Sequence, residues 1–123
     1  MKIAITSQGP GPNSAVDPRF GRAPWFVICD TETGEFEPRE NAQNVNALRG
    51  AGIQAAEKIA RHGVAFLLTG HCGPNAFRTL SAAGIKVIVG VKGTVAEAVE
   101  RFKRGELSPV DRPDVEGHWV QPT

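Results

Sequence analysis

The chain has 123 residues, 41% of them hydrophobic and 22% charged, which allows one buried core but not two. Its formal net charge of +1 supplies no basic field, so we expect neither a nucleic-acid partner nor a membrane partner. It contains no apolar run of roughly 20 residues, no signal-peptide pattern and no CxxC pair, which favours a cytoplasmic protein with reduced thiols.

The first half of the chain has the pattern of three strands. An apolar strand over residues 2–5 precedes a loop rich in proline and glycine that extends to Pro24. Loops of this length are uncommon in compact domains unless they have a function. A second strand is expected over residues 25–30. After a hairpin turn, the polar residues 35–41 contain Pro38, which favours an edge strand.

The second half alternates helices and strands. The apolar spacing predicts a helix from Ala51 to Gly63, a strand over 64–70, a helix over 74–84, a strand over 85–90 and a helix over 94–105. This order requires right-handed crossovers and a parallel core, whereas the hairpin requires one antiparallel strand. Residues 109–123 are rich in proline and have no period, so we expect an irregular C-terminal tail.

Three glycine-rich loops, at residues 6–13, 69–75 and 90–94, are expected at the carboxyl ends of strands. Ligands bind at that edge of open α/β sheets, and two of the loops lead into helix N-termini, which attract anions. Together the loops could form an anion cradle, although each glycine could instead only permit a tight turn. The candidate binding residues in these loops are Ser7, Gly9, Gly11, Gly70, Gly73 and Asn75.

His71 and Cys72 are adjacent in the middle loop and are candidate metal ligands. Imidazole and thiolate bind copper, zinc and metal sulfides, and a thiol near a helix N-terminus and a histidine is expected to be partly activated. A single pair cannot complete a four-ligand zinc site. The alternative is that Cys72 packs under the loop while His71 is exposed to solvent.

Three arginines that precede the second predicted strand or the first predicted helix are candidate anion ligands. Arg19 and Arg22 flank Phe20 ahead of the second strand, and Arg49 precedes the first helix. Arginine suits multivalent anions because its planar guanidinium presents several donors. The alternative is that Phe20 packs in the core and the arginines are solvated.

The sequence does not favour an enzyme. His71 is poorly placed as a general base for Cys72, because adjacent side chains usually diverge. Hydrolysis of phosphate esters by two metal ions requires converging carboxylates. Asp17 lies in a loop, whereas Asp30 and Glu32 lie at the far end of an antiparallel strand, so we do not expect these acids to converge.

Three motifs in order carry a family resemblance: FGRA at 20–23, GAGIQAAE at 50–57 and TGHCGPNAF at 69–77. Over residues 2 to 108 the chain resembles the dinitrogenase iron–molybdenum cofactor biosynthesis family, which includes nitrogenase accessory factors. It is more similar to the orange-protein branch, whose cofactor is a molybdenum–copper sulfide cluster, than to the nitrogenase cofactor carriers. The resemblance implies a nitrogenase accessory factor-like, cluster-binding domain over residues 1–108.

The resemblance also implies an α/β fold with a ribonuclease H-like motif. Its mixed five-stranded sheet has the order 3-2-1-4-5, with strand 2 antiparallel and helices on both sides. The implied function is non-enzymatic binding, carriage or storage of a metal–sulfur cluster, of the molybdenum–copper sulfide or iron–molybdenum type. His71 or Cys72 would bond its softer metal and Phe20 would exclude water. The alternative is a partner-binding regulator of an ATPase or cluster-assembly machine, without its own cofactor.

Overall fold

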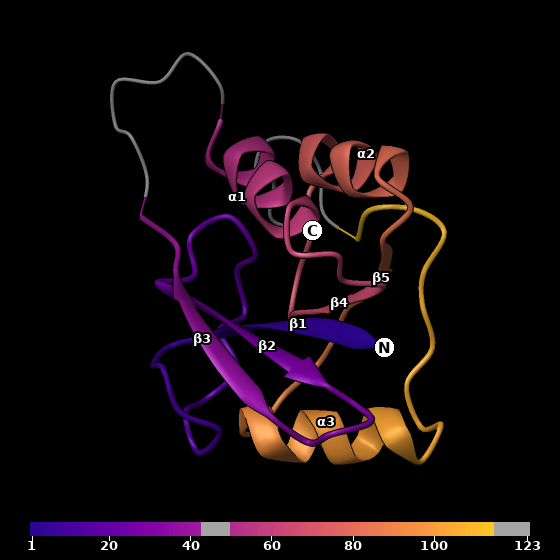
Figure 1. Cartoon of the computed structure of the whole chain (residues 1–123). Coiled ribbons are helices and arrows are strands. Elements are labelled where there is room, and N and C mark those ends of the chain that lie inside the picture. Colours follow the sequence, from indigo (N-terminus) through magenta and orange to yellow (C-terminus); the bar gives the residue numbers. More distant parts are fainter. Residues whose placement is uncertain (43–49, 115–123) are drawn as a thin grey trace, which may run out of the picture.

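The structure, a computed structural model, describes residues 1–42 and 50–114. Helices α1 and α2 cover one face of a central sheet, and α3 covers the other (Figure 1). The elements are β1 (Lys2–Ser7), β2 (Trp25–Asp30), β3 (Phe36–Glu40), α1 (Ala51–Ala60), β4 (Phe66–Leu68), α2 (Pro74–Ala82), β5 (Lys86–Ile88) and α3 (Val95–Lys103).

The five-stranded sheet has the order β3-β2-β1-β4-β5, which confirms the expected topology. Strand β2 is antiparallel to both β1 and β3, whereas β1, β4 and β5 are mutually parallel. The last two strands are shorter than expected, with three residues each. Thr69 and Gly70, expected at the end of one strand, instead belong to the loop that follows β4.

The side chains of the sheet alternate between two apolar clusters, as the two-residue period of a strand requires. Ala4, Ile28 and Leu67 face the helix pair α1 and α2. Ile3, Ile5 and Leu68 face α3. Strand β4 is covered on both faces, which explains why its sequence is continuously apolar rather than alternating, and in β5 both Val87 and Ile88 are buried.

The C-terminal strap, residues 106–114, follows α3 and runs past β5 toward α2 (Figure 1). Val110 pairs with Val87 on the outer edge of β5, and its N–H donates to the Val87 carbonyl at 2.8 Å. This part of the expected irregular tail is therefore attached to the sheet, although its backbone forms no helix or extended strand within residues 106–114. Arg49 and residues 115–123 of the tail lie outside the described residues.

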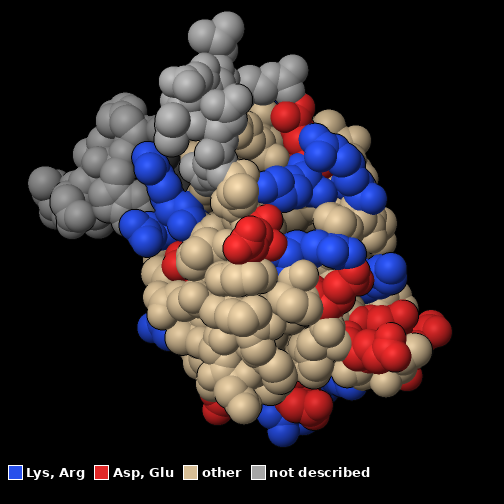
Figure 2. All heavy atoms as spheres, turned by 60° about the vertical axis from the view of Figure 1, so that its left-hand side comes forward, with Lys and Arg blue, Asp and Glu red and all other residues tan. Residues whose placement is uncertain are grey.

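Surface charge is mixed, in keeping with the net charge of +1. Figure 2 shows acidic and basic side chains on one face, and neither sign covers it. No helix within residues 1–42 and 50–114 is long and apolar enough to cross a membrane. The cysteines Cys29 and Cys72 are both buried and form no disulfide.

Candidate functional site

A cavity of about 810 Å³ lies where three of the predicted motifs meet. This volume falls within the usual range for small-ligand sites, about 300–1,000 Å³. The cavity is bounded by the loop before β2, the start of α1 and the start of α2. Its lining residues are Pro18, Arg19, Phe20, Gly21, Arg22, Gly50, Ala51, Gly52, Ile53, His71, Gly73, Pro74, Asn75 and Ala76.

The loop before β2 is held in place by Asp17, which is 2% exposed. Its carboxylate Oδ1 accepts a hydrogen bond from the Arg19 N–H at 2.8 Å, and its carbonyl accepts one from the Thr6 hydroxyl at 2.7 Å. One residue further, the Phe20 N–H donates to the His71 carbonyl at 3.3 Å. These hydrogen bonds attach the loop before β2 to β1 through Thr6 and to the loop after β4 through His71.

Two glycines allow the three segments to approach one another closely. A Cβ atom at Gly70 would lie 2.6 Å from Pro18 Cα, and one at Gly21 would lie 2.8 Å from Gly52 N. Real Cβ atoms essentially never make contacts this short. Gly21 and Gly70 are therefore required by the close packing of these segments, whether or not a ligand binds.

The N-termini of α1 and α2 both line the cavity and lack side-chain caps. Their N-cap residues are Gly50 and Gly73, and neither helix has an acidic residue in its first turn. By contrast, α3 begins with a complete capping box formed by Thr94 and Glu97. Because first-turn N–H groups have no acceptor within their own helix, α1 and α2 present partial positive charge and donors to the cavity.

The charged side chains of the lining are basic. Arg19 and Arg22 belong to it, and no carboxylate does within the described part of the chain. Three other hollows on the described surface each include at least two acidic side chains. Arg19 Nε lies 3.8 Å from Asp17 Oδ1, but the arginine side chain is 63% exposed. The cavity is therefore suited to an anion.

Phe20 provides an apolar wall for the cavity rather than an exposed cover. It is 2% exposed, and its ring centroid lies 5.7 Å from that of Phe26 in the core. Both the packing interpretation and the lining role of Phe20 are therefore compatible with the structure. The arginines on either side of it are exposed.

His71 and Cys72 point in different directions. His71 lines the cavity and its side chain is 45% exposed. Its Nδ1 lies 2.8 Å from Asp114 Oδ2, and the Cys72 N–H donates to Asp114 Oδ1 at 2.7 Å. Asp114 comes from the C-terminal strap and was not a candidate from the sequence, because nothing in residues 109–123 indicates a contact with residue 71.

The expectation of an activated Cys72 thiol is wrong. Cys72 is 1% exposed and belongs to the cluster of core residues under α1 and α2. Burial, together with a smaller contribution from the nearby Asp114 carboxylate, raises the pKa of this thiol to about 12. The increase in the thiol pKa caused by burial is thus larger than the decrease expected from the nearby helix N-terminus. Cys72 does not line the cavity, so His71 is the candidate metal ligand that reaches it.

The first glycine-rich loop lies elsewhere. The Ser7 hydroxyl donates to the Gly9 carbonyl at 2.6 Å, and the Gly11 N–H donates to the Ser14 hydroxyl at 3.3 Å. Beyond them, the Val95 N–H at the start of α3 donates to the Ser14 carbonyl at 2.9 Å. The loop therefore packs on α3, and Ser7, Gly9 and Gly11 do not line the cavity.

The sequence-based candidates thus occupy different parts of the structure. One group lines the cavity, whereas Gly70 packs against Pro18 behind it and Cys72 is buried in the core. Ser7 ends β1, Gly9 and Gly11 lie in the loop on α3, and Arg49 lies outside the described residues. The candidates that the structure brings together are Arg19, Phe20, Arg22, His71, Gly73 and Asn75.

The acidic residues weighed for metal-dependent hydrolysis do not converge. Asp30 pairs with Lys2 at the amino end of β1, whereas Asp17 lies beside Thr6 near its carboxyl end. Among the described residues, no group of three or more histidine, cysteine or acidic side chains could hold a metal ion. A cluster in the cavity would therefore have few protein ligands.

Comparison with known proteins identifies related chains. A family model described as dinitrogenase iron-molybdenum cofactor matches residues 1–105. The apo form of the orange protein from Desulfovibrio gigas shares 45% identity and a TM-score of 0.87, covering 92% of this chain and 95% of that one.

Two further proteins are similar to this chain over most of their length. A NifB-like protein from Thermotoga shares 39% identity and a TM-score of 0.74, covering 88% of this chain and 91% of that one. An uncharacterized protein of Methanocaldococcus jannaschii is 32% identical over 109 residues, which are 87% of this chain and 89% of that protein.

Proposed function

Because the chain belongs to the dinitrogenase iron–molybdenum cofactor family, we propose that it is a non-enzymatic protein that binds and carries or stores a metal–sulfur cluster. The observation that carries this proposal is the charge of the cavity. It combines two arginines with two uncapped helix N-termini, and its described lining contains no carboxylate. The cluster is the cargo of the protein, and no chemical step on it is required.

A thiometallate cluster is a compact polyanion with sulfide on its surface, and the lining matches these properties. Arg19 and Arg22 would neutralise its charge, as guanidinium groups do for multivalent anions. The first-turn N–H groups of α1 and α2 would donate hydrogen bonds to sulfide. His71 would bond the softer metal, since imidazole is a good ligand for copper. Phe20 would exclude water from one side.

The more specific form of the proposal is a molybdenum–copper sulfide cluster, which rests on the resemblance to the orange-protein branch. The alternative of a regulator that docks on an ATPase or assembly protein has no specific support among the described residues. Among the described residues, Met1 is the one large apolar residue that is exposed.

An anaerobic titration tests the proposal. Metal-free protein is mixed with tetrathiomolybdate and Cu(I), desalted, and examined by visible absorbance and metal analysis. We expect a retained band with molybdenum and copper in fixed proportion to protein. No retained metal on protein with an intact circular dichroism spectrum would contradict the molybdenum–copper form of the proposal.

A pair of double variants shows whether the retained metal occupies the cavity. Arg19→Gln with Arg22→Gln removes both guanidinium groups of the lining and should lower retention. Arg39→Gln with Arg104→Gln is the matched control, because these arginines make the same change in net charge but pair with Glu37 and Glu106 and do not line the cavity. Equal losses in the two double variants would indicate non-specific attraction.

A further inference from the structure

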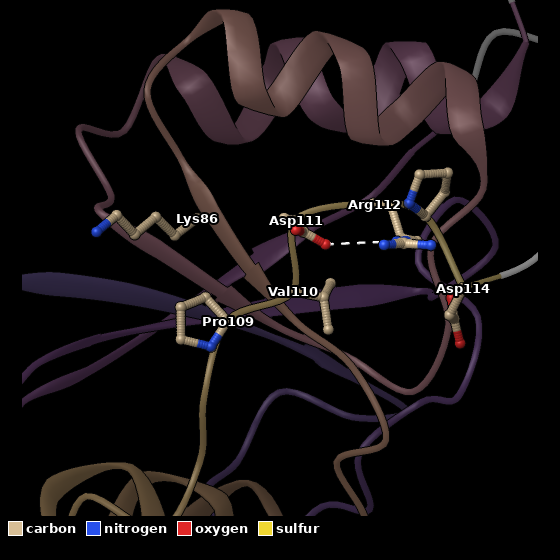
Figure 3. Close-up of a pocket in the computed structure, with 7 residues that line it drawn as sticks. Lys86, Pro109, Val110, Asp111, Arg112 and Asp114 are labelled. Atoms are coloured by element: carbon tan, nitrogen blue, oxygen red, sulfur yellow. Dashed lines mark hydrogen bonds and ion pairs between the residues drawn. The ribbon is translucent and has the colours of Figure 1, made fainter.

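The C-terminal strap places the Asp114 carboxylate next to His71, the candidate metal ligand. Figure 3 shows Asp111 and Arg112 of the strap directed toward each other, whereas the Asp114 carboxylate is directed away from this pair. The pairing of Val110 with Val87 attaches the strap to the sheet upstream of Asp114. Pro113 restricts the backbone immediately before it. Asp114 therefore has a defined position although it follows no helix or strand.

Asp114 contacts the His71–Cys72 segment through both carboxylate oxygens and its backbone. Oδ2 lies 2.8 Å from His71 Nδ1, and Oδ1 accepts the Cys72 N–H at 2.7 Å. The Asp114 N–H donates in return to the Cys72 carbonyl at 3.3 Å. These two hydrogen bonds to the backbone of Cys72 fix the position of the carboxylate relative to the loop, so that Oδ2 lies against Nδ1 of the imidazole ring.

The contact determines which imidazole nitrogen carries the hydrogen. An ionised carboxylate only accepts hydrogen bonds, so the neutral ring must carry its hydrogen on Nδ1. The lone pair is then on Nε2, on the side of the ring away from Asp114. Histidines that ligate metals commonly donate their second ring N–H to a carboxylate, which sets tautomer and orientation and raises ligand basicity.

We propose that Asp114 is a positioning residue, which holds His71 in the tautomer and orientation that present Nε2 to the metal of the cargo. The inference rests on the proposed function in one respect, namely that the cargo contains a metal that bonds imidazole. It adds to the site a residue from outside residues 1–105, the part of the chain that the family model matches. The strap thereby becomes part of the binding site.

The test is the isosteric variant Asp114→Asn. Its amide oxygen can still accept the Cys72 N–H, but its NH₂ group then faces His71 Nδ1 and donates to it. The ring must place its hydrogen on Nε2, which removes the lone pair needed by a metal. An analogous aspartate-to-asparagine change in a protease triad keeps the geometry but imposes the wrong tautomer. Asp114→Ala removes both groups and should leave a mixture of tautomers.

Long-range ¹H–¹⁵N correlation spectra of the metal-free protein, recorded at alkaline pH so that the ring is neutral, report the tautomer directly. We expect the Nδ1–H form in the wild type and the Nε2–H form in Asp114→Asn. Asp111→Asn is the matched control, since it makes the same change on the strap at an exposed residue whose recorded partner is Arg112. A wild-type tautomer in Asp114→Asn would overturn the proposal.

Cargo retention supplies the second readout. Loss of such a supporting contact typically lowers metal affinity by about 10- to 100-fold, so Asp114→Asn should retain correspondingly less copper after loading with Cu(I) and tetrathiomolybdate. In a His71→Ala background the same change should have no further effect, because Asp114 acts through His71. An equal further loss there would overturn the proposal.

The two readouts separate this inference from the proposed function. If the wild type retains no metal while the tautomer changes as expected, the molybdenum–copper proposal fails and the positioning of His71 stands. If the wild type retains metal while the tautomer is unaffected by Asp114→Asn, the cargo proposal stands and the positioning role fails.

Discussion

Replacing Gly70 with alanine tests whether close contact between the two loops of the cavity determines its shape. Gly70 does not have the left-handed backbone conformation that favours glycine, so alanine is tolerated conformationally. The effect is instead steric, because the new Cβ would lie 2.6 Å from Pro18 Cα and 2.7 Å from Pro18 O. Carbon atoms pack best at about 3.5–4.0 Å, so the loops must separate by roughly 1 Å.

The expected cost follows from two opposing effects. Overpacking of this kind destabilises proteins by about 1–3 kcal/mol. A change from glycine to alanine also restricts the unfolded chain, which offsets about 0.4–1 kcal/mol. We therefore expect a net loss of roughly 1–2 kcal/mol in the free energy of unfolding, or about 4–8 °C in melting temperature for a domain of this size.

Thermal unfolding followed by circular dichroism measures this loss, and desalting after loading measures cargo retention. Gly11→Ala is the matched control, because its Cβ would meet no atom within 4 Å and its φ is not in the left-handed region. Gly70→Ala should melt lower and retain less cargo than Gly11→Ala. Equal melting temperatures and equal retention would refute the reasoning that glycine is required at this contact.

Three further predictions address charge, the buried thiol and the opposite face. Arg22→Gln should weaken cargo binding by roughly 10- to 100-fold, the value of a charged hydrogen bond, whereas Arg78→Gln on the exposed side of α2 should not; equal affinities would exclude Arg22 from the site. Because the folded pKa of Cys72 is about 12 against an ordinary 9.0, the unfolded thiol ionises first, and stability should fall as pH rises above about 9, by up to about 1.4 kcal/mol per unit. Urea unfolding should show a shallower alkaline decline in Cys72→Ala than in the wild type; identical declines would contradict the burial argument. Thr94→Ala removes the α3 cap and should cost about 1 kcal/mol without changing cargo retention, and a loss of cargo would place the site on the α3 face.

The fold is predictable because its signals are local. The continuous apolar residues around Leu67 indicate a strand covered on both faces, and Pro38 indicates the edge strand that the structure confirms. Helix α3 lies within the range 94–105 expected from the apolar spacing, and its N-cap is Thr94. The order of the strands came from the family resemblance, because periodicity alone does not determine which strands are neighbours.

The site is only partly predictable, since its composition depends on which face of the sheet each loop covers. Strand-to-loop transitions locate the loop at Gly9 and the loop at His71 at the same edge of the sheet, but the first packs on α3 and the second borders α1 and α2. The Cys72 side chain is directed into the core by the packing of the loop between β4 and α2. The position of Cys72 in the sequence, just before a predicted helix, does not indicate this direction. Asp114 has no periodic pattern or motif, so its contact with His71 is visible only in three dimensions.

The most direct test of the central claim, that the cargo lies in the cavity at the N-termini of α1 and α2, is a comparison of ¹⁵N–¹H correlation spectra with and without bound copper–thiomolybdate. The account predicts that the largest amide shifts map to residues 19–22, 51–53 and 71–76. Shifts centred on residues 7–13 and the start of α3, with the cavity amides unchanged, would contradict it.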